Sequence, residues 1–215
     1  MDVSAQPELV AREPTVRVLI LNAGKATRLD GHDKLFVEAG GVPVHEWHRR
    51  AYDGLDVALV TRTGKATPDW ITRVHRHDAS DGPLGAVNSY LHAYDDDKEL
   101  LVVYADTLIA KQDLPDGDWV GVSLLLQRRW DHVNRYGQWV NDILPQQVGV
   151  GVYRFADLDL LRRCIESLDI KLDHHLPDLL NLYAASRYLT PFTVVGWHDA
   201  GDWAALSRVP NIHSL

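Results

Sequence analysis

Short strand-like runs that are apolar on both faces constrain the fold of this chain more than any other feature. Residues 16–21, 57–61 and 100–104 are rich in Val, Leu and Ile, and the first run ends at the turn-forming sequence Asn22-Ala23-Gly24. Such runs are typical of central strands in parallel sheets, because helices cover both faces of those sheets. Residues 44–52 and 85–94 have helical character and lie between the runs. The pattern therefore predicts βαβ units and a parallel sheet.

The remaining chain extends this α/β pattern. Further strands are expected at residues 120–126, 148–155 and 193–197, helices at 158–168 and 176–186, and a short helix near Ala204. The type of segment 70–74 stays open. Residues 1–15 contain Pro7 and Pro14 without a hydrophobic period, and they predict a flexible tail. We expect one domain over residues 16–215.

Charge and cysteine content exclude several classes of protein. The 215 residues include 22 Lys+Arg and 30 Asp+Glu, which gives a formal net charge of -8. That charge disfavours a nucleic-acid partner and an anionic membrane surface, although it is compatible with a local basic pocket. The single Cys164 excludes an intrachain disulfide framework and a Cys-based zinc cluster. No segment approaches the ~20 apolar residues of a membrane span. Residues 1–15 also lack the apolar core of a signal peptide, so we expect a cytoplasmic protein.

The loop after the first strand has the composition of a phosphate site. Small residues at positions 23, 24 and 26 let a ligand approach the backbone, whose N–H groups can bind an anion. Lys25, Arg28 and Lys34 add three cations within ten positions. The loop matches neither the P-loop nor the Gly-x-Gly-x-x-Gly pattern. From the residues alone, a plain polar connection between a strand and a helix remains an alternative.

Three further polar clusters follow expected strands or open a helix. Residues 81–86 begin a helix with Gly82 and Gly85, and helix N-termini present unpaired N–H groups. Asp106 follows the strand at 100–104, and Asp199 follows the last expected strand. Ligands of open α/β sheets bind outside the carboxyl ends of the strands, so these clusters are candidates for one site.

These motifs, taken in order, resemble the nucleotidyltransferases that make nucleotide sugars. The signature loop of that family is matched by Leu21-Asn22-Ala23-Gly24-Lys25-Ala26-Thr27-Arg28-Leu29 with Lys34, and Asp33-Lys34 is closer to the molybdopterin-cofactor nucleotidyltransferases. Gly82-Pro83-Leu84-Gly85-Ala86, Tyr104-Ala105-Asp106 and Trp197-His198-Asp199-Ala200-Gly201 resemble later motifs of the family. The resemblance runs from about Val16 to Ser207. It implies a Rossmann-like three-layer α/β/α fold with a mixed, mainly parallel central sheet.

The resemblance also implies a reaction and a set of site residues. The reaction is a Mg²⁺-dependent transfer of an NMP from an NTP to a phosphorylated acceptor, and it releases pyrophosphate. A sugar 1-phosphate is the expected class of acceptor. Arg28 and Lys34 are the implied catalytic cations, and Asp106 and Asp199 are the implied metal ligands. Acceptor binding is implied for Tyr136, Gly137 and Gly151. Nucleotide binding is implied for Leu21, Asn22, Ala23, Gly24, Lys25, Ala26, Thr27, Gly82, Pro83, Leu84 and Gly85.

Departures from the family pattern keep two alternatives open. The Glu-Lys-Pro motif that sugar-phosphate enzymes carry is absent from residues 142–147, so the acceptor is not fixed. A glycosyltransferase on the same fold is one alternative, although such enzymes generally show an Asp-x-Asp that Asp106-Thr107-Leu108 lacks. A non-catalytic nucleotide-binding relative is the other, because Ala26, Ala105 and Asp202 replace family residues. The base of the NTP and the oligomeric state also stay open.

Overall fold

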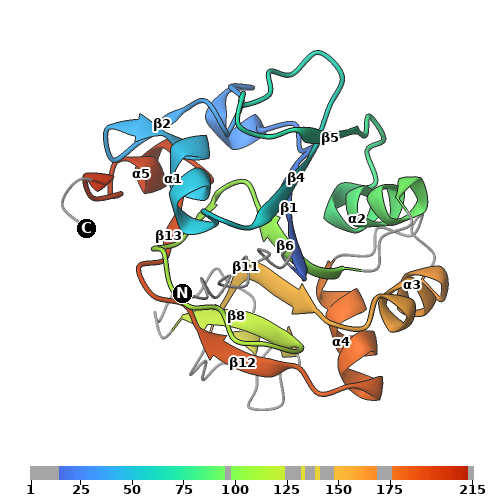
Figure 1. The fold of residues 1–215 in the computed structure, drawn as a ribbon. Coiled ribbons are helices and arrows are strands. Elements are labelled where there is room, and N and C mark those ends of the chain that lie inside the picture. Colours follow the sequence, from blue (N-terminus) through green and yellow to red (C-terminus); the bar gives the residue numbers. More distant parts are fainter. Residues whose placement is uncertain are drawn as a thin grey trace, which may run out of the picture.

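A computed structural model gives the structure of residues 15–94, 98–123, 132–133, 139–140, 148–168 and 176–212. Its centre is a sheet to which nine of the described strands belong (Figure 1). These strands are β1 (Val16–Asn22), β4 (Asp56–Thr61), β5 (Arg73–Arg76), β6 (Glu99–Tyr104), β8 (Trp119–Ser123), β9 (His132–Val133), β10 (Trp139–Val140), β11 (Val148–Phe155) and β12 (Thr190–Thr193).

The sheet is mixed, with a parallel part that follows the predicted βαβ units. β1 pairs in parallel with β4 and with β6, and β4 pairs in parallel with β5. β11 lies antiparallel between β6 and β8, and β12 pairs in parallel with β8. All seven residues of β1 are buried, as expected for a central strand covered on both faces.

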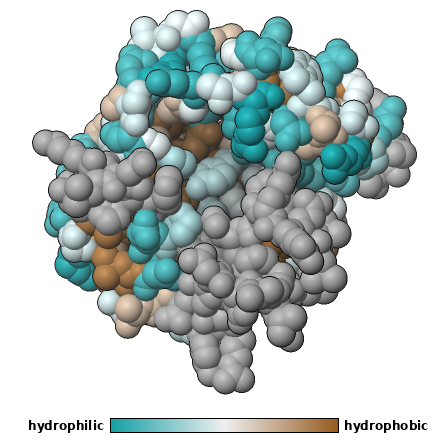
Figure 2. All heavy atoms as spheres, turned by 180° about the vertical axis from the view of Figure 1, so that it is seen from behind, coloured by the Kyte–Doolittle hydropathy of each residue, from teal (hydrophilic) through white to brown (hydrophobic). Residues whose placement is uncertain are grey.

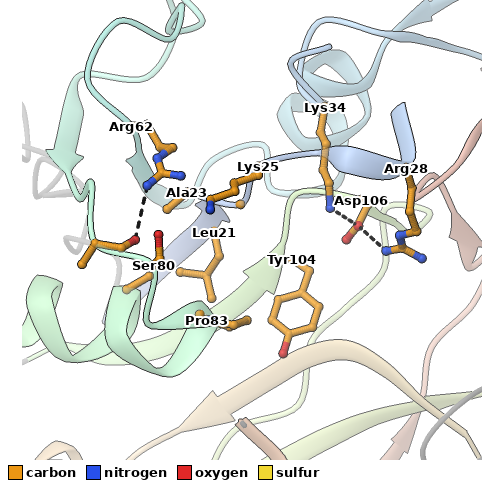
Figure 3. A pocket seen from close by; sticks show the side chains of 14 residues that line it. Leu21, Ala23, Lys25, Arg28, Lys34, Arg62, Ser80, Pro83, Tyr104 and Asp106 are labelled. Carbon is orange, nitrogen blue, oxygen red and sulfur yellow. Dashed lines mark hydrogen bonds and ion pairs between the residues drawn. The ribbon is translucent and has the colours of Figure 1, made fainter. Parts of the chain in front are cut away.

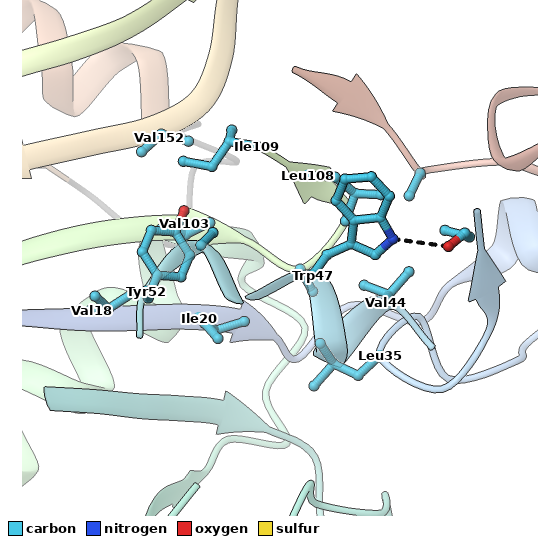
Figure 4. Close-up of a cluster of buried hydrophobic side chains, with 14 of the residues drawn as sticks. Val18, Ile20, Leu35, Val44, Trp47, Tyr52, Val103, Leu108, Ile109 and Val152 are labelled. Carbon is cyan, nitrogen blue, oxygen red and sulfur yellow. Dashed lines mark hydrogen bonds between the residues drawn. The ribbon is translucent and has the colours of Figure 1, made fainter. Parts of the chain in front are cut away.

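Helices cover both faces of the sheet, which confirms the expected three layers (Figure 1). α2 (Gly82–Ala93), α3 (Leu158–Glu166) and α4 (Leu176–Ser186) pack on one face, where Leu19 of β1 points. α1 (Val44–Ala51) packs on the other face, where Tyr52 lies near Val18 and Trp47 lies near Leu108 (Figure 4). α5 (Trp203–Leu206) lies on the same side as α1. The alternation of side chains along β1 therefore divides the core into two clusters.

Short elements complete the fold. They are the 3-10 turn η1 (Thr27–Leu29) and the paired strands β2 (Glu38–Ala39) with β3 (Val42–Pro43) and β7 (Thr107–Leu108) with β13 (His198–Asp199). Segment 70–74, whose type the sequence left open, contains the start of β5. In the described part of the chain, no helix combines the length and the apolar character needed to cross a bilayer.

The predicted strand at 193–197 is wrong beyond its first residue. β12 ends at Thr193, and Gly196 then adopts a left-handed backbone with φ 61. The apolar run is still partly buried, because Val194 and Trp197 join the core while Val195 stays exposed. The run therefore forms a connection from β12 to β13. Its apolar composition predicted a strand, but that composition reflects partial burial of a connection. The helix expected at 85–94 begins three residues earlier, at Gly82.

The surface opposite the view of Figure 1 is mainly hydrophilic in its upper half, around a hollow that shows hydrophobic residues (Figure 2). Large exposed hydrophobic side chains among the described residues are few: Phe36, Tyr188, Val195 and Trp203. Scattered residues of this kind are normal on a globular protein.

Candidate active site

The candidate site lies where the parallel strands end. In the sheet register, Leu21 of β1 lies beside Tyr104 of β6, and Asn22 lies beside Thr61 of β4. The loops that leave these strands enclose a cavity of about 490 Å³. Its lining residues come from segments far apart in sequence (Figure 3): Leu21, Ala23, Gly24, Lys25, Arg28, Lys34, Arg62, Ala79, Ser80, Gly82, Pro83, Ala86, Tyr104 and Asp106. Such a position is typical of ligand sites in α/β sheets.

Asn22 shapes the signature loop from within the protein. Its side chain is 2% exposed, and its Nδ2 donates to Asp33 Oδ1 at 2.8 Å. The same Asp33 oxygen accepts the backbone N–H of Leu35 at 3.2 Å. Asn22 thus joins the end of β1 to the turn that carries Lys34. Its contribution to the site is to place Lys34, since Asn22 does not line the cavity.

Arg28 and Lys34 both point toward Asp106 (Figure 3). Lys34 Nζ donates to Asp106 Oδ2, and Arg28 Nη2 lies 3.7 Å from the same oxygen. Arg28 is 55% exposed and Lys34 is 19% exposed, so the two cations differ in their access to solvent. One edge of the site therefore combines a carboxylate with two cations, of which Arg28 is the more exposed.

Asp106 and Asp199 converge although 93 positions separate them in sequence. β7 and β13 pair antiparallel, with Asp199 opposite Thr107, and Ala200 N donates to Asp106 O at 2.8 Å. Gly201 lies between the two carboxylates. A Cβ at this glycine would come 2.9 Å from Asp199 Oδ1, 3.2 Å from Asp106 Oδ2 and 3.0 Å from Arg28 Nη2. Three functional groups thus surround one small space that a side chain would fill.

The donors around this space fit a hard divalent cation. Mg²⁺ prefers carboxylate oxygens and commonly takes one or two of them, together with water and substrate phosphate. The described residues contain no cluster of three or more His, Cys, Asp or Glu side chains placed to hold a metal. The pair Asp106 and Asp199 therefore suits a metal that shares its coordination with a phosphorylated ligand, and it does not suit a closed structural site.

His48 supports the backbone next to Asp106. Its Nε2 lies 2.9 Å from Ala105 O, and because a carbonyl can only accept, Nε2 carries the proton. The imidazole is 1% exposed, and burial lowers the pKa of His48 to about 4. The ring also stacks on Tyr52, at 6.0 Å between centroids and 12° between planes. α1 thereby contributes a neutral histidine that fixes the strand end carrying Asp106.

A second cavity of about 150 Å³ adjoins the first, and the two share Arg28, Tyr104 and Asp106. Asp199, Thr107, Tyr153 and Gly151 line it as well. Gly151 has φ +78, and a Cβ there would meet Thr107 Oγ1 at 2.7 Å, so glycine is required at this position. Tyr136 and Gly137, for which acceptor binding was predicted, lie outside the described residues.

The structure brings together most of the residues implied by the resemblance. Several of the residues predicted to bind the nucleotide do not line the cavity: Asn22, Ala26, Thr27, Leu84 and Gly85. Leu84 is fully buried in the core beneath α2, and the Asp81 carboxylate packs over Gly85. Arg62, Ser80 and Tyr104 line the cavity without having been predicted. Arg62 directly follows β4 as Ala23 follows β1, so the rule that ligands bind at the carboxyl ends of strands could have identified it.

Comparison with known proteins identifies this arrangement. Residues 18–116, which run from within β1 to beyond β7, match the family model of the MobA-like NTP transferase domain. This segment is similar to an NTP transferase domain. The resemblance to nucleotidyltransferases noted in the sequence is thereby confirmed. Among curated proteins, none matches the sequence significantly.

Solved structures extend the likeness in fold to nearly the whole chain. A UDP-glucose pyrophosphorylase complexed with UDP-glucose superposes with a TM-score of 0.75 at 13% identity, over 92% of this chain and 98% of that one. A provisionally assigned glucose-1-phosphate thymidylyltransferase from Bacillus anthracis gives 0.74 at 17%, over 93% and 95%. The inositol-1-phosphate CTP transferase from T. maritima gives 0.66 at 14%, over 90% and 95%. These TM-scores show a shared fold, and at identities of 13% to 17% the likeness shows the fold alone.

Proposed function

We propose that this protein is a Mg²⁺-dependent nucleotidyltransferase that transfers an NMP from an NTP to a phosphorylated acceptor and releases pyrophosphate. The observation that carries the proposal is the convergence of Asp106, Asp199 and Arg28 around Gly201, beside the cavity of the signature loop. The solved structures with this fold include proteins named for UDP-glucose, glucose 1-phosphate and inositol 1-phosphate. A phosphorylated sugar or polyol is therefore the acceptor class we favour. A cytoplasmic location remains a prediction from the sequence.

The larger cavity is proposed to hold the NTP. Ala79, Pro83 and Ala86 give its lining an apolar part that suits a base, and Arg62 and Ser80 supply polar groups. Lys25 and the small residues Ala23 and Gly24, also in the lining, suit phosphates. In the proposed complex the α-phosphorus lies toward Asp106, where the two cavities meet.

In the proposed reaction, an acceptor phosphate oxygen attacks the α-phosphorus, and the bond to the bridging oxygen of the β-phosphate breaks. The electron pair of that bond leaves with pyrophosphate. The barrier comes mainly from repulsion between anions and from alignment, so catalysis requires positioning and cations and needs no covalent nucleophile. When bound to Asp106 and Asp199, Mg²⁺ would offset phosphate charge and help to orient the reacting groups.

Arg28 and Lys34 have distinct proposed parts in this step. Arg28 lines both cavities, so its guanidinium reaches the boundary across which the NMP moves. It can donate to oxygens of both substrates as charge develops on the pyrophosphate. Lys34 bonds Asp106 directly, and its charge stays close to the carboxylate that would hold the metal.

The decisive experiment is a pyrophosphate-release screen of the four NTPs against a panel of phosphorylated acceptors. We expect release that depends on Mg²⁺, stops with EDTA and returns when Mg²⁺ is added. Release of a nucleoside diphosphate from a nucleotide sugar, without pyrophosphate release, would instead identify the glycosyltransferase alternative. Binding of Mg·NTP without turnover over the whole panel would favour the non-catalytic relative.

A further inference from the structure

Lys65, in the loop after β4, forms hydrogen bonds with the signature loop, although the two loops lie far apart in the sequence. Its Nζ donates to Asn22 O and to Gly24 O, each at 3.1 Å. Lys65 is half-buried and does not line the cavity, whereas Ala23, Gly24 and Lys25 do. The ammonium therefore contacts the loop from outside the ligand space.

These two bonds orient the loop amides. In a planar trans peptide the C=O and the following N–H point in opposite directions. Fixing Asn22 O and Gly24 O toward Lys65 thus directs the N–H groups of Ala23 and Lys25 away from it. Backbone N–H groups that face a cavity can bind phosphate oxygens. An ammonium on the carbonyl side prevents the peptides from turning over and presenting carbonyl oxygens to an anion.

The surroundings of Lys65 hold it in place. Gly64 has φ +81, and Lys65 N donates to Arg62 O at 3.3 Å, which closes a tight turn. Arg76 donates to Arg62 O at 2.8 Å and to Lys65 O at 3.1 Å. The loop after β4 is thereby tied to the end of β5, and Lys65 extends from a rigid support.

The positive charge of Lys65 also lies near a carboxylate that supports the loop, that of Asp33. Burial lowers the pKa of Lys65, and the nearby Asp33 carboxylate opposes that effect. Asp33 Oδ2 is buried without a hydrogen-bond partner among the described residues. The ammonium therefore offsets the charge of the carboxylate that binds Asn22 and precedes Lys34.

We propose that Lys65 is a positioning residue that presets the nucleotide-binding loop for the phosphates of the NTP. This inference rests on the proposed function and deepens it, because it assigns a role to a residue outside the ligand space. The contact joins positions 43 and 41 residues apart, between loops at neighbouring strand ends.

The test compares Lys65→Met, Lys65→Arg and a control, Lys111→Met. Lys111 is 62% exposed and pairs with Asp53 at 2.9 Å, away from both cavities, so its variant removes a lysine charge without touching the loop. Binding of each of the four Mg·NTPs and of Mg·tripolyphosphate is measured by calorimetry, and kcat and KM are measured for the NTP that wild type uses. Hydrogen exchange of segment 22–26 is measured by mass spectrometry on the full chain.

We expect Lys65→Met to weaken Mg·NTP binding by about tenfold to a hundredfold, the range for loss of hydrogen bonds to a charged group. KM for the NTP should rise more than kcat falls, because bound NTP can still order the loop. Hydrogen exchange should accelerate in segment 22–26. Lys65→Arg should restore part of the affinity, and Lys111→Met should match wild type.

Unchanged affinity within about twofold, together with unchanged exchange in segment 22–26, would overturn the role of Lys65. A uniform rise in exchange over the whole sheet would also overturn it, because that result indicates general destabilisation. If wild type binds neither the NTPs nor tripolyphosphate, the proposed function fails. In that case the exchange of segment 22–26 still decides whether Lys65 holds the loop.

Discussion

At the scale of single residues, Arg28 is the side chain on which we expect turnover to depend most. It lines both cavities and lies 3.7 Å from Asp106 Oδ2. Arg28→Ala should reduce kcat by about two to three decades, the range for loss of one donor to transition-state charge. Steady-state pyrophosphate release measures this effect.

Arg49→Ala is the matched control for Arg28→Ala. Arg49 is also 55% exposed and pairs with a carboxylate, Glu46, at 2.7 Å, but it lines neither cavity. We expect wild-type turnover from this variant. A near-wild-type rate in Arg28→Ala, with an intact fold by circular dichroism, would remove Arg28 from the mechanism.

Tyr52 has an unusual environment for a tyrosine. It is 1% exposed, and its hydroxyl has no hydrogen-bond partner among the described residues. Burial raises the pKa of Tyr52 far above its ordinary value. Tyr52→Phe keeps the ring and its stacking on His48 but removes the unsatisfied hydroxyl. We expect the free energy of unfolding to rise by about 1 kcal/mol in urea titrations.

Tyr183→Phe is the matched control for Tyr52→Phe and should have the opposite sign. Tyr183 is also fully buried, but its hydroxyl donates to Asp118 Oδ1 at 2.6 Å. Its removal should lower the free energy of unfolding by about 1 to 3 kcal/mol. A loss of stability in Tyr52→Phe would instead contradict an unsatisfied hydroxyl at Tyr52.

At the scale of elements, the pairing of β7 with β13 creates the space between the two carboxylates. Gly201→Ala would place a methyl group 2.9 Å from Asp199 Oδ1. We expect Mg²⁺ affinity and turnover to fall by about tenfold to a hundredfold, as when the surroundings of a metal ligand are altered. Mg²⁺ titrations of pyrophosphate release measure the effect.

Arg208→Ala provides the control at this end of the chain, because Arg208 is exposed just after α5. It should leave the Mg²⁺ dependence unchanged. Wild-type Mg²⁺ dependence in Gly201→Ala would show that no metal occupies the space beside Gly201.

The elements also show which features the sequence can predict. Strands such as β1 and β6 are mostly apolar and internal to the sheet, so their composition predicts them. The segment from Val194 to Trp197 has a similar composition and is a connection, because Gly196 turns the chain toward β7. Apolar composition reports burial, and burial does not by itself specify an extended backbone.

At the scale of the whole molecule, acid should destabilise the protein through histidines whose pKa is lowered by burial. These are the buried His48 and the partly buried His45, His75 and His198. The unfolded chain takes up protons as the pH falls below about 6.5, whereas folded His48 does so only near pH 4. The free energy of unfolding should therefore decrease as the pH falls through this window, by about 3 kcal/mol from His48 alone.

Urea titrations at several pH values between 7 and 4 measure this slope. His48→Gln should give a shallower slope than wild type, since it removes the group with the largest shift among these histidines. His92→Gln, on the exposed face of α2, should retain the wild-type slope. A stability that is independent of pH over this range would contradict a buried, neutral His48.

The sequence by itself determined the α/β class, the strand ends that carry polar clusters, and the motifs of the signature loop with Asp106 and Asp199. These features are local, because they depend on neighbouring residues and on a short hydrophobic period. The tertiary structure alone decided which segments meet: the pairing of β7 with β13, the contact of Lys65 with the carbonyls of Asn22 and Gly24, and the support of Ala105 by His48. Such contacts depend on how the sheet orders its strands and on what each loop packs against, and a hydrophobic pattern does not encode that order.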